Sequence, residues 1–160
     1  MRLTVLIIMM AALAIPSCAE TDSKAEVFSD QAVTSQLTAL LQAAKGSGSG
    51  GGTLGDYKSH AIKLSVRVAS GGAEVHAHFA DIFFVTGGKA ELTTGGSVVN
   101  PKTDSDGETK GSRIEHGKSV TIAKGDLVHI PAGVPHQLTV VPGSEYSSIV
   151  VKVRESSERP

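Results

Sequence analysis

The strongest constraint on the fold is an alternation of apolar and polar residues with a period of two, which begins near Tyr57. It is clearest at residues 62–68, where Ile, Leu, Val and Val alternate with Lys, Ser and Arg. Glycine- and proline-containing turns separate this segment from further short apolar runs at 73–78, 82–86, 90–92, 120–122, 127–130, 137–141 and 148–153. Many short strands with tight turns and no helix between them predict an all-β sandwich or barrel.

The composition agrees with this fold class and limits the partners. The 160 residues are enough for one domain, and 18 of them are glycine while 4% are aromatic. The formal net charge is −1 and the chain has no block of basic residues, so the sequence does not indicate binding to nucleic acid.

One helix is expected before the strands, over residues 29–45. Ser29 or Asp30 can cap its first turn, and Gly46 can end it. Its apolar face has helical spacing and consists of Val33, Leu37, Leu40, Leu41 and Ala44. Residues 46–52 contain only glycine and serine, which predicts a flexible linker. They include a G-x-G-x-x-G pattern, but no strand precedes it and no helix follows it, so we do not predict a nucleotide site there.

The first residues have the features of a targeting segment. Arg2 is followed by an uncharged apolar run at 3–15, which is too short to span a bilayer and is typical of a signal peptide. Residues 17–19 (Ser-Cys-Ala) form a small-residue cleavage site, which would remove residues 1–19. Alternatively, Ile-Pro-Ser-Cys resembles a bacterial lipobox, in which the signal ends before Cys18 and this cysteine carries a lipid. Both alternatives predict an exported protein that is periplasmic, secreted or lipid-anchored at the outer surface.

Two histidines on one predicted strand are the first candidates for chemistry. His76 and His78 lie two residues apart in segment 73–78, so both side chains are expected on one face, together with Glu74. Imidazoles held side by side on a strand are suited to a divalent metal ion. The pair alone is weak support, because two histidines can also lie on a surface without a role.

A third histidine follows a predicted chain reversal. Residues 131–135 (Pro-Ala-Gly-Val-Pro) combine two fixed φ angles with one permissive glycine. His136 then begins the returning strand, with Leu138 and Val140 on its own face. The third imidazole is therefore expected over the interior of the barrel.

The spacing of these residues resembles the two motifs of the cupin family. The first motif runs through His-x-His and a glutamate to a glycine, and His76, His78, Asp81 and Gly88 stand at these positions. The second motif runs through glycine, Pro-x-Gly, histidine and asparagine, and Gly125, Pro131, Gly133 and His136 stand at its first four positions.

The chain departs from the family pattern at three points. Asp81 replaces the glutamate and lies one residue too close to His78. The glycines at 71 and 72 lie nearer to the histidines than the family's glycine does, and Val140 replaces the final asparagine.

The resemblance covers roughly residues 57–153 and implies a single cupin-type β-barrel, also called a double-stranded β-helix or jelly roll, with one N-terminal helix. The expected parts are a signal peptide (1–19), the helix and its Gly/Ser linker (20–52), the cupin barrel (53–154) and a polar tail (155–160).

The resemblance also implies a set of metal ligands. His76, His78 and His136 would bind one divalent transition metal ion, which can be Fe, Mn, Ni, Cu or Zn, and Asp81 would take the glutamate's place. Glu74 is the rival carboxylate, and it is also the candidate catalytic residue. If Glu74 is not a ligand, it can accept a hydrogen bond from an imidazole N–H and so orient the ring.

Three functions remain open at this point: a metal-dependent enzyme of oxygenase, isomerase or lyase type, a non-catalytic binding module, and a structural cupin stabilised by its metal. The expected partner is a small molecule. The predicted interior, with Phe83, Val85, Leu138 and Val140, is mostly apolar and has no Lys or Arg for a phosphate. A homodimer and a membrane contact through lipid on Cys18 are further alternatives.

Overall fold

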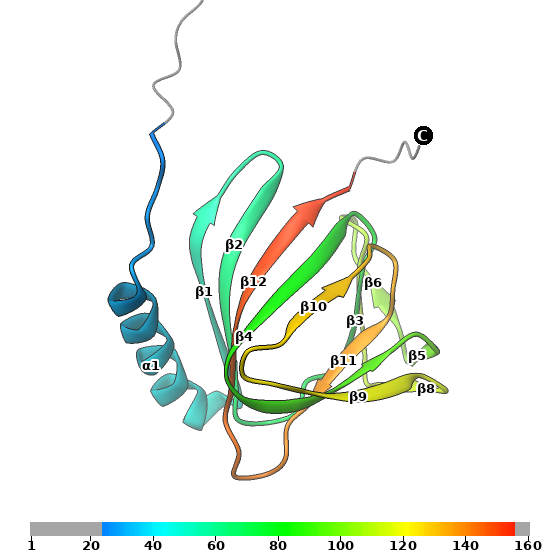
Figure 1. Ribbon diagram of the computed structural model, residues 1–160. Helices are drawn as coiled ribbons and strands as arrows, with labels where there is room; N and C mark the ends of the chain where they lie inside the picture. The colour runs from blue at the N-terminus through cyan, green and yellow to red at the C-terminus, as the bar shows by residue number, and fades with distance from the viewer. Residues whose placement is uncertain (1–23, 156–160) are drawn as a thin grey trace, which may run out of the picture.

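The computed structural model describes residues 24–155, in which an antiparallel sheet curls into a barrel and one helix packs outside it (Figure 1). The helix α1 spans Asp30–Ser47. The strands are β1 (Ser49–Asp56), β2 (His60–Arg67), β3 (Ala73–His76), β4 (Phe79–Thr94), β5 (Ser97–Val99), β6 (Lys102–Thr103), β7 (Glu108–Gly111), β8 (Arg113–Glu115), β9 (Lys118–Ala123), β10 (Leu127–Ile130), β11 (His136–Thr139) and β12 (Tyr146–Arg154). The predicted signal peptide and most of the predicted polar tail lie outside the described residues.

The order of hydrogen-bonded neighbours in the main sheet is β1-β2-β12-β4-β11-β3-β7-β6, and β9 and β10 also pair with β4. The short strands β5 and β8 form a separate ribbon. The prediction of an all-β domain with one N-terminal helix is confirmed. Residues 100–112 are polar and rich in turn formers, and most of them are exposed, but they contain the short strands β6 and β7.

The long strand β4 closes the barrel because its two halves pair with strands on opposite sides of the barrel. Residues 79–88 pair with β12, whereas residues 91–94 pair with β11. The chain bends at Gly88, which has a φ of 68°. The sequence predicted two strands separated by a turn at 87–88, and the structure has one continuous bent strand.

Gly88 is expected to be one of the least replaceable residues of the fold. A Cβ at this position would lie 1.8 Å from the Glu145 carbonyl oxygen, and the positive φ adds strain for any L side chain. Gly88→Ala should therefore lower the free energy of unfolding by at least about 3 kcal/mol, measured by urea denaturation. The matched control is Gly95→Ala, which has a φ of 72° and nothing within 4 Å, and should cost only about 1 kcal/mol. Equal losses of unfolding free energy in the two variants would show that the backbone around Glu145 moves to relieve the clash at Gly88.

The helix is capped at Ser29, whose Oγ accepts a hydrogen bond from the Ala32 amide at 3.3 Å. It ends at Gly48 and not at Gly46, with the Gly48 N–H donating to the Ala44 carbonyl at 2.7 Å.

The prediction of a flexible linker over 46–52 is wrong, because residues 49–52 form the first half of β1. Glycine has a weak preference for strands, but here the ladder to β2 supplies the order. The absence of side chains also lets α1 lie close, since a Cβ on Gly50 would be 3.3 Å from the Leu40 carbonyl oxygen.

Two hydrophobic clusters lie on opposite faces of β2 and β12. Val33, Leu37 and Ala44 of the helix pack with Leu64 and Val66 on the outer face of the sheet. The second cluster fills the barrel interior and includes Phe83, Val85, Leu138, Val140, Tyr146 and Val150. Because the apolar face of β2 is turned to the helix, its polar face is turned into the barrel.

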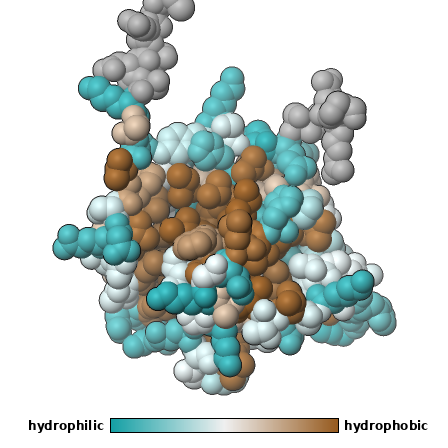
Figure 2. Space-filling model, in the orientation of Figure 1, coloured by the Kyte–Doolittle hydropathy of each residue, from teal (hydrophilic) through white to brown (hydrophobic). Residues whose placement is uncertain are grey.

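Part of the outer face is not covered by the helix. Figure 2 shows hydrophobic side chains gathered on this side of the molecule. Phe84 and its cross-strand neighbour Leu127 are 49% and 70% exposed.

Within residues 24–155 there is no helix that is both long and apolar enough to cross a membrane. The predicted homodimer stays a prediction.

Candidate metal centre

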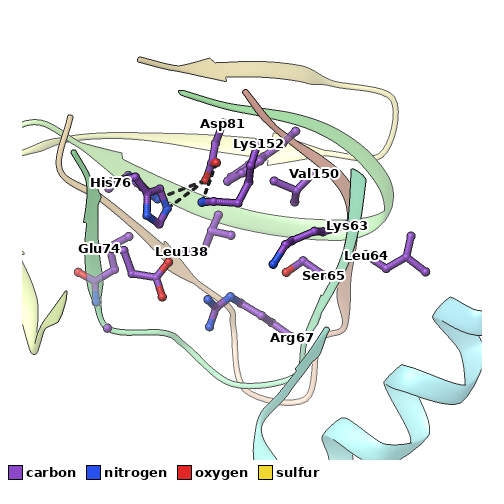
Figure 3. A pocket seen from close by; sticks show the side chains of 14 residues that line it. Lys63, Leu64, Ser65, Arg67, Glu74, His76, Asp81, Leu138, Val150 and Lys152 are labelled. Carbon is purple, nitrogen blue, oxygen red and sulfur yellow. Dashed lines mark hydrogen bonds and ion pairs between the residues drawn. The ribbon is translucent and has the colours of Figure 1, made fainter. Parts of the chain in front are cut away.

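The barrel encloses a cavity of about 220 Å³, whose walls come from β2, β3, β4, β11 and β12 (Figure 3). One side of the cavity carries histidines and carboxylates, and another side carries basic residues from β2. The side chains that matter chemically are Lys63, Arg67, Glu74, His76, Asp81, His136 and Lys152.

The two buried histidines come from neighbouring strands. His76 is the last residue of β3 and His136 is the first of β11, and their ring centroids are 5.0 Å apart. The predicted turn at 131–135 brings them together, since the Gly133 amide donates to the His76 carbonyl at 2.8 Å. Glu74 is the cross-strand partner of His136, so its carboxylate lies beside both rings.

The hydrogen bond of His136 determines which of its nitrogens faces the cavity. Its Nδ1 lies 3.0 Å from the Val134 carbonyl oxygen, and a carbonyl can only accept, so Nδ1 carries the proton. Burial lowers the pKa of His136 and favours the neutral ring. The Nε2 lone pair is therefore free for a metal ion, as in sites where a backbone carbonyl orients the imidazole.

His76 is held by a carboxylate in the same way. Its Nδ1 bonds to Glu108, the cross-strand partner on β7. Burial alone lowers the pKa of His76, but the hydrogen bond and charge of Asp81, with help from Glu108, raise it above its ordinary value. Its Nε2 points to Asp81.

Asp81 is buried in the barrel together with Phe83 and Val85, and it lines the cavity. Its Oδ2 lies 3.2 Å from Nε2 of His76 and 3.9 Å from Nε2 of His136. Its Oδ1 accepts a hydrogen bond from Nζ of Lys152 at 2.9 Å, across the β4–β12 pair. Burial raises the pKa of Asp81, but His76 and Lys152 outweigh this and lower it, so the carboxylate is ionised.

This donor set fits a divalent metal ion. Ligand atoms of Glu74, His76 and His136 all lie within 4.8 Å of one another, and Asp81 Oδ2 approaches the same two ring nitrogens. The lone pair of a neutral His136 facing a carboxylate oxygen is unfavourable unless a cation lies between them. Histidine and carboxylate ligands suit the first-row transition metals.

The structure does not bring His78 into this group. The strand ends at His76, and His78 lies exposed in the bend that leads to β4. The prediction that His76 and His78 share the face of one strand is wrong, because the period-two rule stops where the strand stops.

Several residues of the cavity were missed by the sequence analysis. Lys63, Arg67 and Lys152 were not expected in the interior, and Glu108, which bonds to His76 without lining the cavity, was not singled out. The predicted interior without Lys or Arg is therefore wrong. The sequence signal for Lys152 was its alternation with Val150 on β12, which puts both on one face.

Comparisons with known proteins identify the fold. No family model matches the chain, and no curated protein matches it in sequence. The cupin domain of Schizosaccharomyces pombe Cnp3 matches with a TM-score of 0.51 and 12% identity, over 67% of this chain and 65% of that chain. The DMSP lyase DddQ from Ruegeria pomeroyi DSS-3 matches with a TM-score of 0.49 and 18% identity, over 70% of this chain and 49% of that chain.

The polyketide cyclase RemF from Streptomyces resistomycificus matches with a TM-score of 0.49 and 17% identity, over 69% of this chain and 68% of that chain. The part of this chain that matches spans about half the length of the lyase and about two thirds of the other two chains. At these identities the likeness concerns the fold alone.

Proposed function

This chain has the cupin fold, and we propose that its barrel is a metal centre that binds and transforms a small molecule. The observation that carries this proposal is that two buried histidines lie beside carboxylates on one wall of the cavity. Glu74 forms a group with both histidines in which the ligand atoms lie within 4.8 Å of one another, and Asp81 Oδ2, outside that group, lies 3.2 and 3.9 Å from their Nε2 atoms. His76, His136 and Asp81 would hold the metal, and Glu74 is either a fourth ligand or the group that exchanges a proton with the substrate. The bound metal would act as a Lewis acid or as a substrate-binding centre.

The surrounding residues are suited to hold this set in place. Glu108 and the Val134 carbonyl each fix one imidazole, and Lys152 fixes the carboxylate of Asp81. A structural role for the metal alone would not require an open cavity of about 220 Å³ beside the ligands. The remaining alternative is a binding protein without catalysis, which a substrate screen with the metal-loaded protein would separate from an enzyme.

The first test is the metal content of the protein. Protein purified without chelators should carry close to one equivalent of a first-row transition metal. Removing it with EDTA should lower the melting temperature, because a ligand bound to the native state stabilises that state. Adding back one equivalent should restore it. The proposal would be contradicted if the protein bound no divalent metal ion at micromolar concentration.

We also propose that the chain is exported, on the grounds of its first nineteen residues. Mass spectrometry of the protein from its native host should find a mature chain that begins at Cys18 or Glu20. If Cys18 carries a lipid, Cys18→Ser should move the protein from the membrane fraction to the soluble fraction. Recovery of a chain that still begins at Met1 would refute both alternatives.

A further inference from the structure

Two basic side chains of the cavity have no partner within the described part of the chain. Lys152 is paired with Asp81, but Lys63 and Arg67 make no hydrogen bond or ion pair with any of residues 24–155. Lys63 is exposed to solvent and can be paired with water, whereas Arg67 is half-buried, so it is Arg67 that needs a partner. In particular, Nε of Arg67 is buried and has no hydrogen-bond partner. Buried donors in native proteins are nearly always paired, so this atom calls for a group that the protein itself does not supply.

The position of Arg67 is set by its strand and by a glycine. It lies on the inner face of β2 with Lys63 and Ser65, opposite the face that packs against α1. A Cβ on Gly71 would come within 2.4 Å of Nη1 of Arg67, so glycine at this position leaves room for the guanidinium. Figure 3 shows Arg67 and Lys63 reaching from their strand into the cavity, on a different side from His76 and Asp81.

The charges of the cavity wall also favour an anion. The lining residues include three cations, Lys63, Arg67 and Lys152, but only two carboxylates, Glu74 and Asp81. A divalent metal ion would add to this positive excess. Positive charge in a partly enclosed site is stabilised by an anion that forms hydrogen bonds with it.

We propose that Arg67 and Lys63 form a subsite for the carboxylate of a small organic acid, which is the substrate class of this cavity. The planar guanidinium can donate two parallel hydrogen bonds to a carboxylate, one of them from Nε. The lining of the cavity also includes the apolar residues Phe83, Leu138 and Val150, which an aliphatic chain can contact. A cavity of about 220 Å³ is small, which suits a short aliphatic acid.

This inference rests on the proposed function for the role of the acid as substrate, but the subsite itself can be tested without metal. The probes are butanoate and its uncharged isostere butanamide, titrated by calorimetry into the full chain in the presence of EDTA. Butanoate should bind at least about ten times more tightly than butanamide. Inorganic phosphate should bind more weakly than butanoate, because it has no apolar part to contact Phe83, Leu138 and Val150.

The variant Arg67→Gln should weaken butanoate binding at least about tenfold and leave butanamide binding unchanged. Arg113→Gln is the matched control, since it removes the same charge from an exposed ion pair with Glu115 and should change neither. Because Arg67 makes no hydrogen bond or ion pair within residues 24–155, Arg67→Gln should not lower the melting temperature of the ligand-free protein.

Three outcomes would overturn the proposal. Equal affinities for butanoate and butanamide would show that the charge of the carboxylate is not recognised. Binding of phosphate without binding of butanoate would show that the subsite takes a phosphate and not a carboxylate. A lower melting temperature of Arg67→Gln with unchanged butanoate affinity would make Arg67 a structural residue held by water. Loss of metal binding alone would affect the proposed function and leave this subsite in place.

Discussion

His136→Ala is expected to lower the affinity for a divalent metal ion by at least about 100-fold. Its Nε2 is unprotonated and lies 3.9 Å from Asp81 Oδ2, so it is the nitrogen best prepared to bind a metal. Losing a group that merely orients a ligand already costs about 10- to 100-fold in metal affinity, and losing the ligand itself should cost more. His76→Ala should have an effect of the same size. The measurement is competition with a chelator of known affinity.

His78→Ala is the matched control, because it removes the same side chain from the same stretch of the chain. His78 is exposed in the bend between β3 and β4, so the structure predicts a change of less than about threefold. The resemblance to the cupin motif predicts the opposite result, with His78 as a ligand. A loss at His78 as large as at His76 would show that residues 77–78 move inward when metal binds, and that the metal-bound site differs from the one described above.

The inward direction of several site residues could be predicted from the sequence. The period of two places Asp81 on the same face as Phe83 and Val85, and all three are buried in the barrel. The Pro-x-Gly turn fixes the start of β11, and so the position of His136. These predictions hold because they depend on local geometry, which the residues themselves determine.

The orientation of β2 could not be predicted in this way, because alternation shows that a strand has two faces and does not show which face is inside. Leu64 and Val66 are buried, as an alternating pattern suggests, but they are buried by α1 on the outside. The packing of the helix therefore decides that Lys63 and Arg67 enter the cavity.

Two further errors have the same origin in long-range pairing. Glu108 reaches His76 from 32 positions away in the chain, across the β3–β7 pair, and no local pattern marks it. The glycine-rich residues 49–52 are a strand because β2 pairs with them, and an isolated segment of this composition would be flexible.

The last prediction concerns the ion pair between Asp81 and Lys152, whose side chains are 5% and 19% exposed. Asp81→Asn leaves the charge of Lys152 partly buried without its partner. Breaking a buried pair costs about 3–5 kcal/mol, and the exposure of Lys152 reduces this to about 2–3 kcal/mol in the free energy of unfolding of the metal-free protein. Metal affinity should also fall at least about tenfold, because the charged carboxylate oxygen that lies beside the two ring nitrogens is replaced by part of a neutral amide.

Lys152→Met should separate these two effects. The metal-free protein should again lose stability, because the Asp81 carboxylate is left in the barrel without its cation. Metal affinity, however, should be unchanged or up to about tenfold higher, since a positive charge is removed from the neighbourhood of the metal and Asp81 becomes free to bind it. The two single variants are therefore expected to agree in stability and to differ in the direction of the change in metal affinity.

The double variant Asp81→Asn/Lys152→Met completes the cycle. With both charges removed, the metal-free protein should recover to within about 1 kcal/mol of the wild-type free energy of unfolding, whereas metal affinity should remain as low as in Asp81→Asn. Urea denaturation with EDTA and chelator competition measure the two quantities separately. If Lys152→Met weakens metal binding as much as Asp81→Asn does, then Lys152 acts by holding Asp81 in position, and the carboxylate cannot reach the metal without it. If none of the three variants changes metal affinity, Asp81 is not a ligand, and Glu74 is the carboxylate that completes the site.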